Sequence, residues 1–408
     1  MNKVYESFLR ILAAGLQGNR PEDPVLDGEE WDLLLRLASE QEILPLILDA
    51  CTALASFRAA DLPVRRERQK KAFAQTMRQV AQTNEFLTLI RHAQAQGLDP
   101  VVLKGIICRS MYPKPMLRPS VDEDLLIAPE QAEAYHSFFL AEGLFADDPD
   151  ADRAAADELS YHRKKSPTYI ELHKSLFSQS STAYGNLNDL FSGVLERTVT
   201  VQAGDIALRT LAPTDHMLFL ICHAYKHFLH SGVGIRQIAD MALFTNAYGD
   251  AIDWEWIAES CRPVHMEVFT AALFIIAKDY LTLKAIPGPF SVIDVDVQPL
   301  LEDILTGGLY GSVDIDRVHS ANMTLDAVAA QKQGRNSSGI LHSLFPGRDY
   351  LKSQFPFAKK HPILLPLAWV QRVVNYLMHD SKANPAKTIH IGQERVALLR
   401  QYHIIEDD

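Results

Sequence analysis

Residues 101–127 constrain the fold more than any other part of the chain, because short apolar runs and charged groups alternate closely there. The segment reads VVLKGIICRSMYPKPMLRPSVDEDLLI. Its apolar start at 101–103 is typical of a buried strand, and Lys104-Gly105 follows as a turn where glycine removes Cβ hindrance. A short helix is expected next. It should end before residues 112–115, because a residue preceding proline is pushed out of the α region.

A second strand is predicted over residues 121–127, where acidic and apolar side chains alternate. With a period of two, Asp122 and Asp124 share one face and Glu123 faces the other. Burying two ionised carboxylates on one face is costly unless a partner compensates their charge. Mg²⁺ is such a partner, because it is usually held by one or two protein carboxylates together with substrate phosphates. The two aspartates are therefore predicted metal ligands.

The charged groups near these aspartates suit phosphate chemistry. Lys104 supplies a point charge, and the helix that begins around Gly105 offers backbone N–H groups to an anion. Arg118 either holds a phosphate through two hydrogen bonds or braces the loop, for example by pairing with Glu123. Ser120 is a weaker candidate, because serine is more often a turn residue than a ligand.

The order of these features resembles the polymerase β-type nucleotidyltransferase superfamily: a strand, Lys104-Gly105, a short helix, and an Arg-x-Ser-x-Asp-x-Asp run over residues 118–124. Within it, the chain is most similar to bacterial proteins known as nucleotidyltransferase family proteins. The superfamily usually has Gly-Gly or Gly-Ser where this chain has Lys104-Gly105. The resemblance extends over a helical lead-in and residues 211–216, 223–244 and 344–366.

The resemblance implies that a nucleoside monophosphate moves from a nucleoside triphosphate such as ATP to an acceptor, with pyrophosphate leaving. It implies that Asp122 and Asp124 bind Mg²⁺, with Mn²⁺ as the alternative, and that a later strand carries a third acid, for which Glu171 fits. His173 lies two residues further and would share the face of Glu171, where it would orient that acid or contact the substrate. The acceptor stays open among a small molecule, a sugar phosphate, a peptide and RNA.

Other classes of function remain open beside this one. His223, His227 and His230 fall on one helical face and form a rival metal site, although no glutamate follows His223 as in a metalloprotease helix. Packing within the helix is the other interpretation of these histidines. Asp240 lies four residues after Arg236, which suggests an intrahelical ion pair or a buried structural acid. The chain would also suit a non-catalytic binding or scaffold protein that keeps the fold.

The expected fold class is α+β, with a small mixed sheet flanked by helical regions at both ends of the chain. We predict a helical lead region over 1–96, the nucleotidyltransferase core over 97–211 and a helical C-terminal domain over 212–408. The elements expected within them are a long helix over 65–92, a helix that starts at 128–130 and runs to 142, a mobile loop over 147–158, a strand over 169–172, a hairpin over 198–209 and a helix from Pro213 capped by Thr214 or Asp215.

Composition narrows the compartment and the partners. The formal net charge of −11 disfavours broad binding to nucleic acid or to an anionic membrane, although a local basic patch would escape this average. The four cysteines are widely spaced without a CxxC pair, which suggests neither disulfides nor a thiolate zinc site and fits the cytoplasm. The N-terminus is expected to form an amphipathic helix, not a signal peptide. The most apolar stretch, 362–370, is too short to span a membrane.

Overall fold

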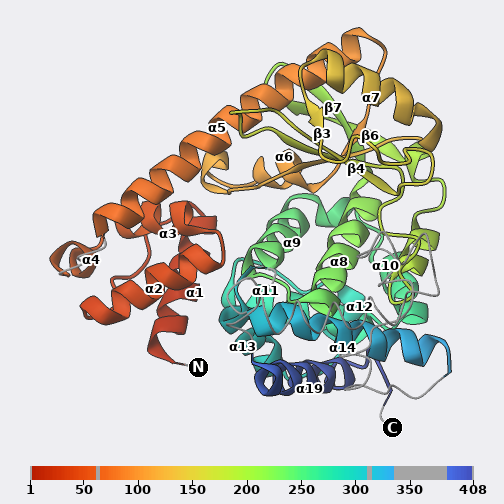
Figure 1. Ribbon diagram of the computed structural model, residues 1–408. Helices are drawn as coiled ribbons and strands as arrows, with labels where there is room; N and C mark the ends of the chain where they lie inside the picture. Colours follow the sequence, from red (N-terminus) through yellow and green to blue (C-terminus); the bar gives the residue numbers. More distant parts are fainter. Residues whose placement is uncertain (1, 61–64, 310–314, 335–383, 407–408) are drawn as a thin grey trace.

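The computed structural model describes residues 2–60, 65–309, 315–334 and 384–406. Along the chain, a group of helices is followed by a mixed sheet and then by a larger group of helices (Figure 1). This arrangement confirms the predicted α+β class with helices at both ends. The segment 344–366, to which the resemblance extended, and the apolar stretch 362–370 lie outside the described residues.

The N-terminal helices pack around a buried apolar core that includes Phe8 and Trp31. At the start of α2, Asp27 accepts a hydrogen bond from the backbone of Glu30, whose side chain accepts one in return, so that two free N–H groups are satisfied. The predicted long helix is confirmed and extends to Ala95. These helices are α1 Lys3–Leu16, α2 Gly28–Glu40, α3 Leu44–Cys51, α4 Ala55–Ala59 and α5 Arg65–Ala95. In Figure 1, α5 leads from the other N-terminal helices to the sheet.

The sheet has seven strands in the order β3-β4-β5-β2-β1-β7-β6. The strand β1 pairs antiparallel with β2 and parallel with β7, and the central strand β2 also pairs parallel with β5. All four residues of β2 are buried. The strands are β1 Val101–Val102, β2 Glu123–Leu126, β3 Phe145–Ala146, β4 Glu158–His162, β5 Tyr169–His173, β6 Thr198–Ala203 and β7 Ile206–Leu211.

Most elements predicted around the sheet are present. The hairpin is formed by β6 and β7, and its turn contains Gly204 with a φ of 65°. Helix α7 (Ala132–Ala141) begins later than expected, because the predicted start at 128–130 forms a 3₁₀ turn over Pro129–Gln131. The strand β4 was not predicted. It starts at the end of the stretch expected to be a loop, and its buried Leu159 and Tyr161 alternate with less buried neighbours.

The C-terminal helices lie beneath the sheet in Figure 1, with α8 and α9 nearest to it. The predicted cap of α8 is wrong, because Pro213 takes the first helical position and places Thr214 and Asp215 inside the first turn. Asp215 instead pairs with Arg197. The helices described here are α8 Pro213–His230, α9 Ile235–Tyr248, α10 Trp254–Cys261, α11 Glu267–Tyr280, α12 Gly288–Ser291, α13 Gln298–Gly307, α14 Ile315–Lys332 and α19 Pro385–Gln401.

The described helices and the cysteines bear on membrane crossing and on disulfide formation. Among the helices in the described ranges, none combines the length and the apolar content needed to cross a membrane. All four cysteines are buried as free thiols. The absence of disulfides therefore agrees with the wide spacing of the cysteines in the sequence.

Candidate active site

The pairing of β2 with β5 brings two predicted acids side by side. Their parallel register sets Asp124 opposite Glu171 and Leu126 opposite His173. Residues at matching positions of neighbouring strands point to the same face of a sheet. Asp124 is only 2% exposed, whereas Glu171 is half-buried. Two carboxylates that are 47 residues apart in the chain therefore meet in the middle of the sheet.

His173 completes this group. Its Nε2 lies 3.1 Å from Asp124 Oδ1 and 3.7 Å from Glu171 Oε2. One ligand atom from each of these three residues lies within 4.8 Å of the others. Among the described residues, this is the only group of three or more acids, histidines or cysteines close enough to share a metal ion. We call Asp124, Glu171 and His173 the β2–β5 cluster.

Lys104, the first residue of α6 (Lys104–Arg109), contacts the cluster. Its Nζ lies 3.2 Å from Asp124 Oδ2 and 3.2 Å from His223 Nε2 on α8. Burial alone would raise the pKa of Asp124, but the charge of Lys104 and the hydrogen bond with His173 outweigh it and lower that pKa well below its usual range. The Asp124 carboxylate is therefore ionised, with Lys104 as its counterion.

Glu171 experiences the opposite effect. Burial, followed by the negative charges of Asp124 and Asp122, raises the pKa of Glu171 to about 8. A cation placed between the two carboxylates would relieve this repulsion. Two carboxylates fit Mg²⁺ or Mn²⁺, and an imidazole beside them is a better ligand for Mn²⁺ than for Mg²⁺. The residues present thus suit a divalent cation.

Asp122, the other predicted ligand, immediately precedes β2 and is partly exposed. It is not one of the three residues whose ligand atoms lie within 4.8 Å of one another. Its charge nevertheless acts on Glu171, and it lines a small pocket next to Lys104. The structure therefore places Asp122 at the edge of the cluster and adds His173 to its centre.

Glu123 and Gly105 hold the opposite face of β2 against α6. Glu123 Oε2 accepts a hydrogen bond from the backbone N–H of Ile106 at 3.0 Å, and its carboxylate forms a buried ion pair with Arg109. A Cβ at position 105 would lie only 2.1 Å from Glu123 Oε2. Gly105 is therefore required for the close approach of a carboxylate, which differs from the turn that the sequence suggested, since position 105 lies within α6.

Arg118 braces the fold, but it pairs with Asp240 and not with Glu123. Its Nε donates to Asp240 Oδ1 on α9 at 2.8 Å, and Tyr112 donates its hydroxyl to the same carboxylate at 2.8 Å. The intrahelical pair between Arg236 and Asp240 is wrong, because Arg236 donates instead to the backbone oxygen of Pro119 at 2.6 Å. Asp240 is only 4% exposed and is therefore a buried structural acid, which was the alternative prediction for this residue.

Ser120 is engaged in the loop before β2. Its hydroxyl accepts a hydrogen bond from Arg109 Nη1 at 2.7 Å, and its backbone N–H donates to Gln79 Oε1 on α5 at 2.7 Å. These contacts agree with a role for Ser120 in the turn. They fix the loop that carries Asp122 toward the sheet.

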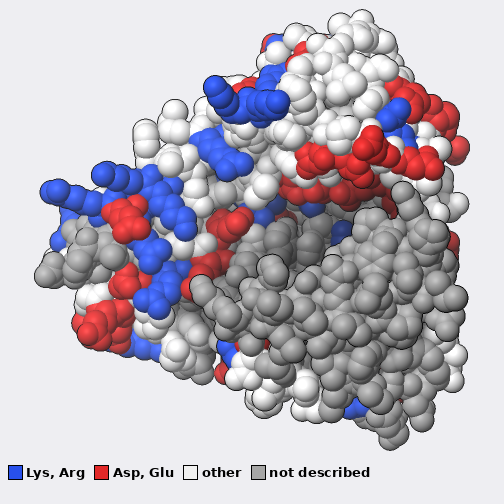
Figure 2. All heavy atoms as spheres, viewed as in Figure 1, with Lys and Arg blue, Asp and Glu red and all other residues white. Residues whose placement is uncertain are grey.

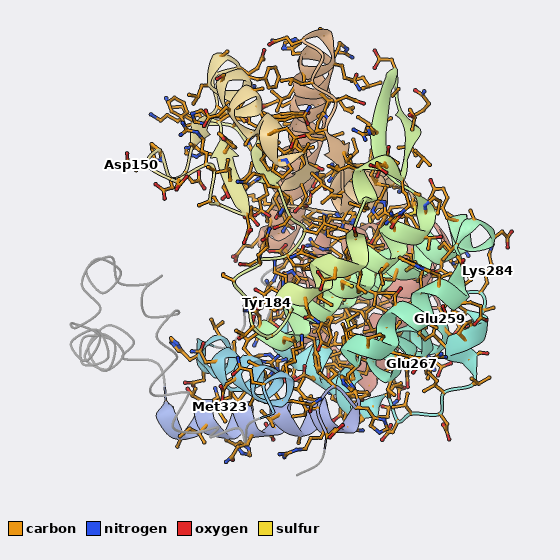
Figure 3. The ribbon with its side chains drawn as sticks, turned by 90° about the vertical axis from the view of Figure 1, so that its right-hand side faces the viewer. Asp150, Tyr184, Glu259, Glu267, Lys284 and Met323 are labelled. Carbon is orange, nitrogen blue, oxygen red and sulfur yellow. The ribbon has the colours of Figure 1, made fainter. Side chains whose placement is uncertain are left out.

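The histidines of α8 do not form a separate metal group within the described ranges. His223 and His227 contact each other, with 3.0 Å between their Nε2 atoms, while His230 lies 3.0 Å from the hydroxyl of Tyr184. Burial, together with the positive charge of Lys104, holds the pKa of His223 well below its ordinary value. Figure 3 shows Tyr184 beside α8, below the loop between β3 and β4 that carries Asp150.

The surface around this region is strongly charged. Figure 2 shows Asp and Glu side chains along one rim of a hollow below the sheet, with Lys and Arg atoms visible inside it. Such a field favours binding of a cation at the rim and of a negatively charged group deeper inside.

The profile of one protein family, described as uncharacterised nucleotidyltransferases, matches residues 27–282, which is more than half of the chain. The chain belongs to this family. The resemblance noted in the run 118–124 is thereby confirmed. The matched part of this chain includes the whole β2–β5 cluster, Lys104 and the helices α8 and α9. A search among curated proteins found no match.

Proposed function

We propose that this protein is a Mg²⁺-dependent nucleotidyltransferase that moves a nucleoside monophosphate from a nucleoside triphosphate to an acceptor group. The observation that carries the proposal is the convergence of Asp124, Glu171 and His173 on one face of the sheet, with Lys104 at contact distance. The family match supports the same class of reaction. In this proposal, the segment 97–211 carries the chemistry and the helices after residue 212 close over it.

The residues have distinct roles in the proposed reaction. Asp124 and Glu171, assisted by Asp122 or His173, would hold Mg²⁺, which offsets the negative charge of the triphosphate when it is bound. Lys104 is close enough to the cluster to compensate further charge as the reaction proceeds. His173 fixes the position of the Asp124 carboxylate through its hydrogen bond.

The covalent step exchanges one phosphorus–oxygen bond for another. The acceptor oxygen bonds to the α-phosphorus while the bond from that phosphorus to the bridging oxygen breaks, and pyrophosphate leaves with the electron pair. The proton of the acceptor hydroxyl passes to the carboxylate of Glu171. The acceptor class stays open.

The test is calorimetric titration of the four nucleoside triphosphates with and without Mg²⁺, on the wild type and on Glu171→Gln. The neutral glutamine has the shape of the protonated side chain, so the fold should be preserved. We expect Mg²⁺-dependent binding of at least one triphosphate by the wild type, weakened about tenfold or more in the variant. Glu130→Gln, at an exposed position, is the matched control and should bind as the wild type does.

Two results would refute the proposal. One is a folded wild type that binds none of the four triphosphates. The other is triphosphate binding whose affinity changes neither on removal of Mg²⁺ nor in Glu171→Gln. Either result would favour the scaffold alternative, in which the fold is kept without catalysis.

A further inference from the structure

A small pocket lies beside the β2–β5 cluster, between the loop before β2 and the helices α8 and α9. Lys104 belongs to both places, because its ammonium group contacts Asp124 and its side chain lines the pocket. We call this space the α9 pocket. Its lining residues are Lys104, Gly105, Arg118, Ser120, Asp122, Leu220, His223, Arg236, Gln237 and Asp240.

Three side chains that line this pocket carry unused hydrogen-bond donors. Arg118 Nη1, Arg236 Nε and Gln237 Nε2 are each buried and have no hydrogen-bond partner in the described part of the chain. The three residues are only 4%, 5% and 8% exposed. A buried donor without a partner costs about 1–3 kcal/mol, so donors gathered around one space indicate a ligand or water with several acceptors.

The remaining atoms of these side chains hold them in place. Arg118 is fixed by Asp240, and Arg236 by the backbone oxygen of Pro119. Gln237 Oε1 accepts the backbone N–H of Gly234 at 2.9 Å, which orients the amide at the start of α9. The donors are thus positioned before any ligand arrives, which lowers the entropic cost of binding.

The lining of the pocket combines positive groups with carboxylates. Lys104, Arg118 and Arg236 bring three positive groups, and Asp240 is already engaged by Arg118 and Tyr112. Asp122 is the other carboxylate of the lining, and its charge also reaches Glu171 in the cluster. A polyphosphate with a bound divalent cation matches this arrangement, because its oxygens accept hydrogen bonds from arginine and amide donors.

We infer that the α9 pocket binds the β- and γ-phosphates of the donor triphosphate, which leave as pyrophosphate, and that Arg236 and Gln237 are binding residues for them. This inference rests on the proposed nucleotidyltransferase function. It assigns to the start of α9 a role that the strand motif alone does not suggest. Arg118 contributes one donor here, in addition to its ion pair with Asp240.

The sharpest variant is Gln237→Glu. It keeps the size of the side chain and the oxygen that accepts from Gly234, but it replaces the unused donor with an acceptor that repels phosphate. Calorimetry with inorganic pyrophosphate in the presence of Mg²⁺ should show affinity reduced about tenfold or more relative to the wild type. Gln202→Glu, which makes the same change at an exposed position of β6, should have no effect.

A second measurement works on the wild type and does not depend on how the variant folds. Pyrophosphate should competitively displace a nucleoside triphosphate bound to the wild type. A third measurement uses Gln237→Glu where it folds: the matching nucleoside monophosphate should bind equally well to this variant and to the wild type. Loss of triphosphate affinity without loss of monophosphate affinity would place the effect at the terminal phosphates.

The outcomes separate the two proposals. If triphosphates bind but neither they nor pyrophosphate respond to Gln237→Glu, the α9 pocket is overturned while the nucleotidyltransferase proposal stands. If pyrophosphate binds and responds to the variant but no triphosphate binds, the pocket is a phosphate site and the proposed function fails. If pyrophosphate does not compete with the triphosphate on the wild type, the inference is wrong. This result does not depend on whether the variant folds.

Discussion

Arg118 and Asp240, which are 122 residues apart in the chain, form a buried ion pair that joins the loop before β2 to helix α9. Both side chains are about 5% exposed. Through this pair, the loop that carries Asp122 and the helix that carries Gln237 are fixed relative to each other. The pair therefore links the strand motif to the C-terminal helices.

Removing one partner of this pair should destabilise the protein strongly. Arg118→Met leaves the Asp240 carboxylate buried without its counterion, and we expect a loss of about 3–5 kcal/mol in the free energy of unfolding. Urea denaturation followed by circular dichroism measures it. Lys114→Met removes an exposed lysine that pairs with Asp49 and should change stability little. Equal effects of the two substitutions would contradict this interpretation of the pair.

Gly105→Ala should also be destabilising, because the new Cβ would overlap the Glu123 carboxylate, which cannot move without breaking its contacts with Ile106 and Arg109. Overpacking of this kind typically costs about 1–3 kcal/mol. The matched control is Gly288→Ala, where a Cβ would meet nothing within 4 Å. Thermal unfolding of the two variants checks the prediction, which fails if both melt like the wild type.

Lys104→Met should make the protein dependent on a cation. Without Lys104, the Asp124 carboxylate loses its ammonium counterion, so the melting temperature in EDTA should fall below that of the wild type. Mg²⁺ or Mn²⁺ would replace the lost positive charge and should raise the melting temperature of the variant more than that of the wild type. Lys3→Met, at an exposed pair with Glu30, should show no such difference. An equal response of all three proteins to the cation would count against a metal site at the cluster.

His216 gives the protein a defined sensitivity to acid. Burial lowers the pKa of His216 to about 3, although the charge of Asp240 opposes this shift. The folded state therefore keeps the imidazole neutral while the unfolded chain gains a proton below pH 6.5, and stability should fall as the pH drops from about 6.5 toward 3.

The contribution of this imidazole is about 1.4 kcal/mol per pH unit within that window. His216→Leu removes the ionisable group, so its stability should fall less than that of the wild type between pH 6.5 and 5. Urea denaturation at the two pH values measures the difference. His390→Leu, at an exposed position of α19, should follow the wild type. Parallel loss of stability in all three proteins would show that His216 is not responsible.

The part of the site that could be predicted from the sequence follows local rules. Alternation along a strand separates Asp124 from Glu123, and a spacing of two residues puts His173 on the face of Glu171. The α+β class and the hairpin of β6 and β7 follow from similar short-range patterns. These features depend on backbone geometry, which neighbouring residues largely determine.

The parts that could not be predicted depend on contacts between distant segments. No local pattern indicates that Arg118 selects Asp240 instead of Glu123, because that choice is made by the packing of α9 near α6. The same packing leaves the donors of Arg236 and Gln237 around one pocket. A single sequence gives the types of these side chains but not the neighbours that satisfy or fail to satisfy them.

The contacts of Glu123, which lies between the two aspartates, limit how this strand can be transferred to another protein. Its side chain connects β2 to α6 through Ile106 and Arg109 on the face opposite Asp124. A graft of the Asp-Glu-Asp strand into another sheet would therefore bring a buried carboxylate without its partners. A transplantable version of this site would have to include α6, with Gly105 and Arg109, as one unit with the strand.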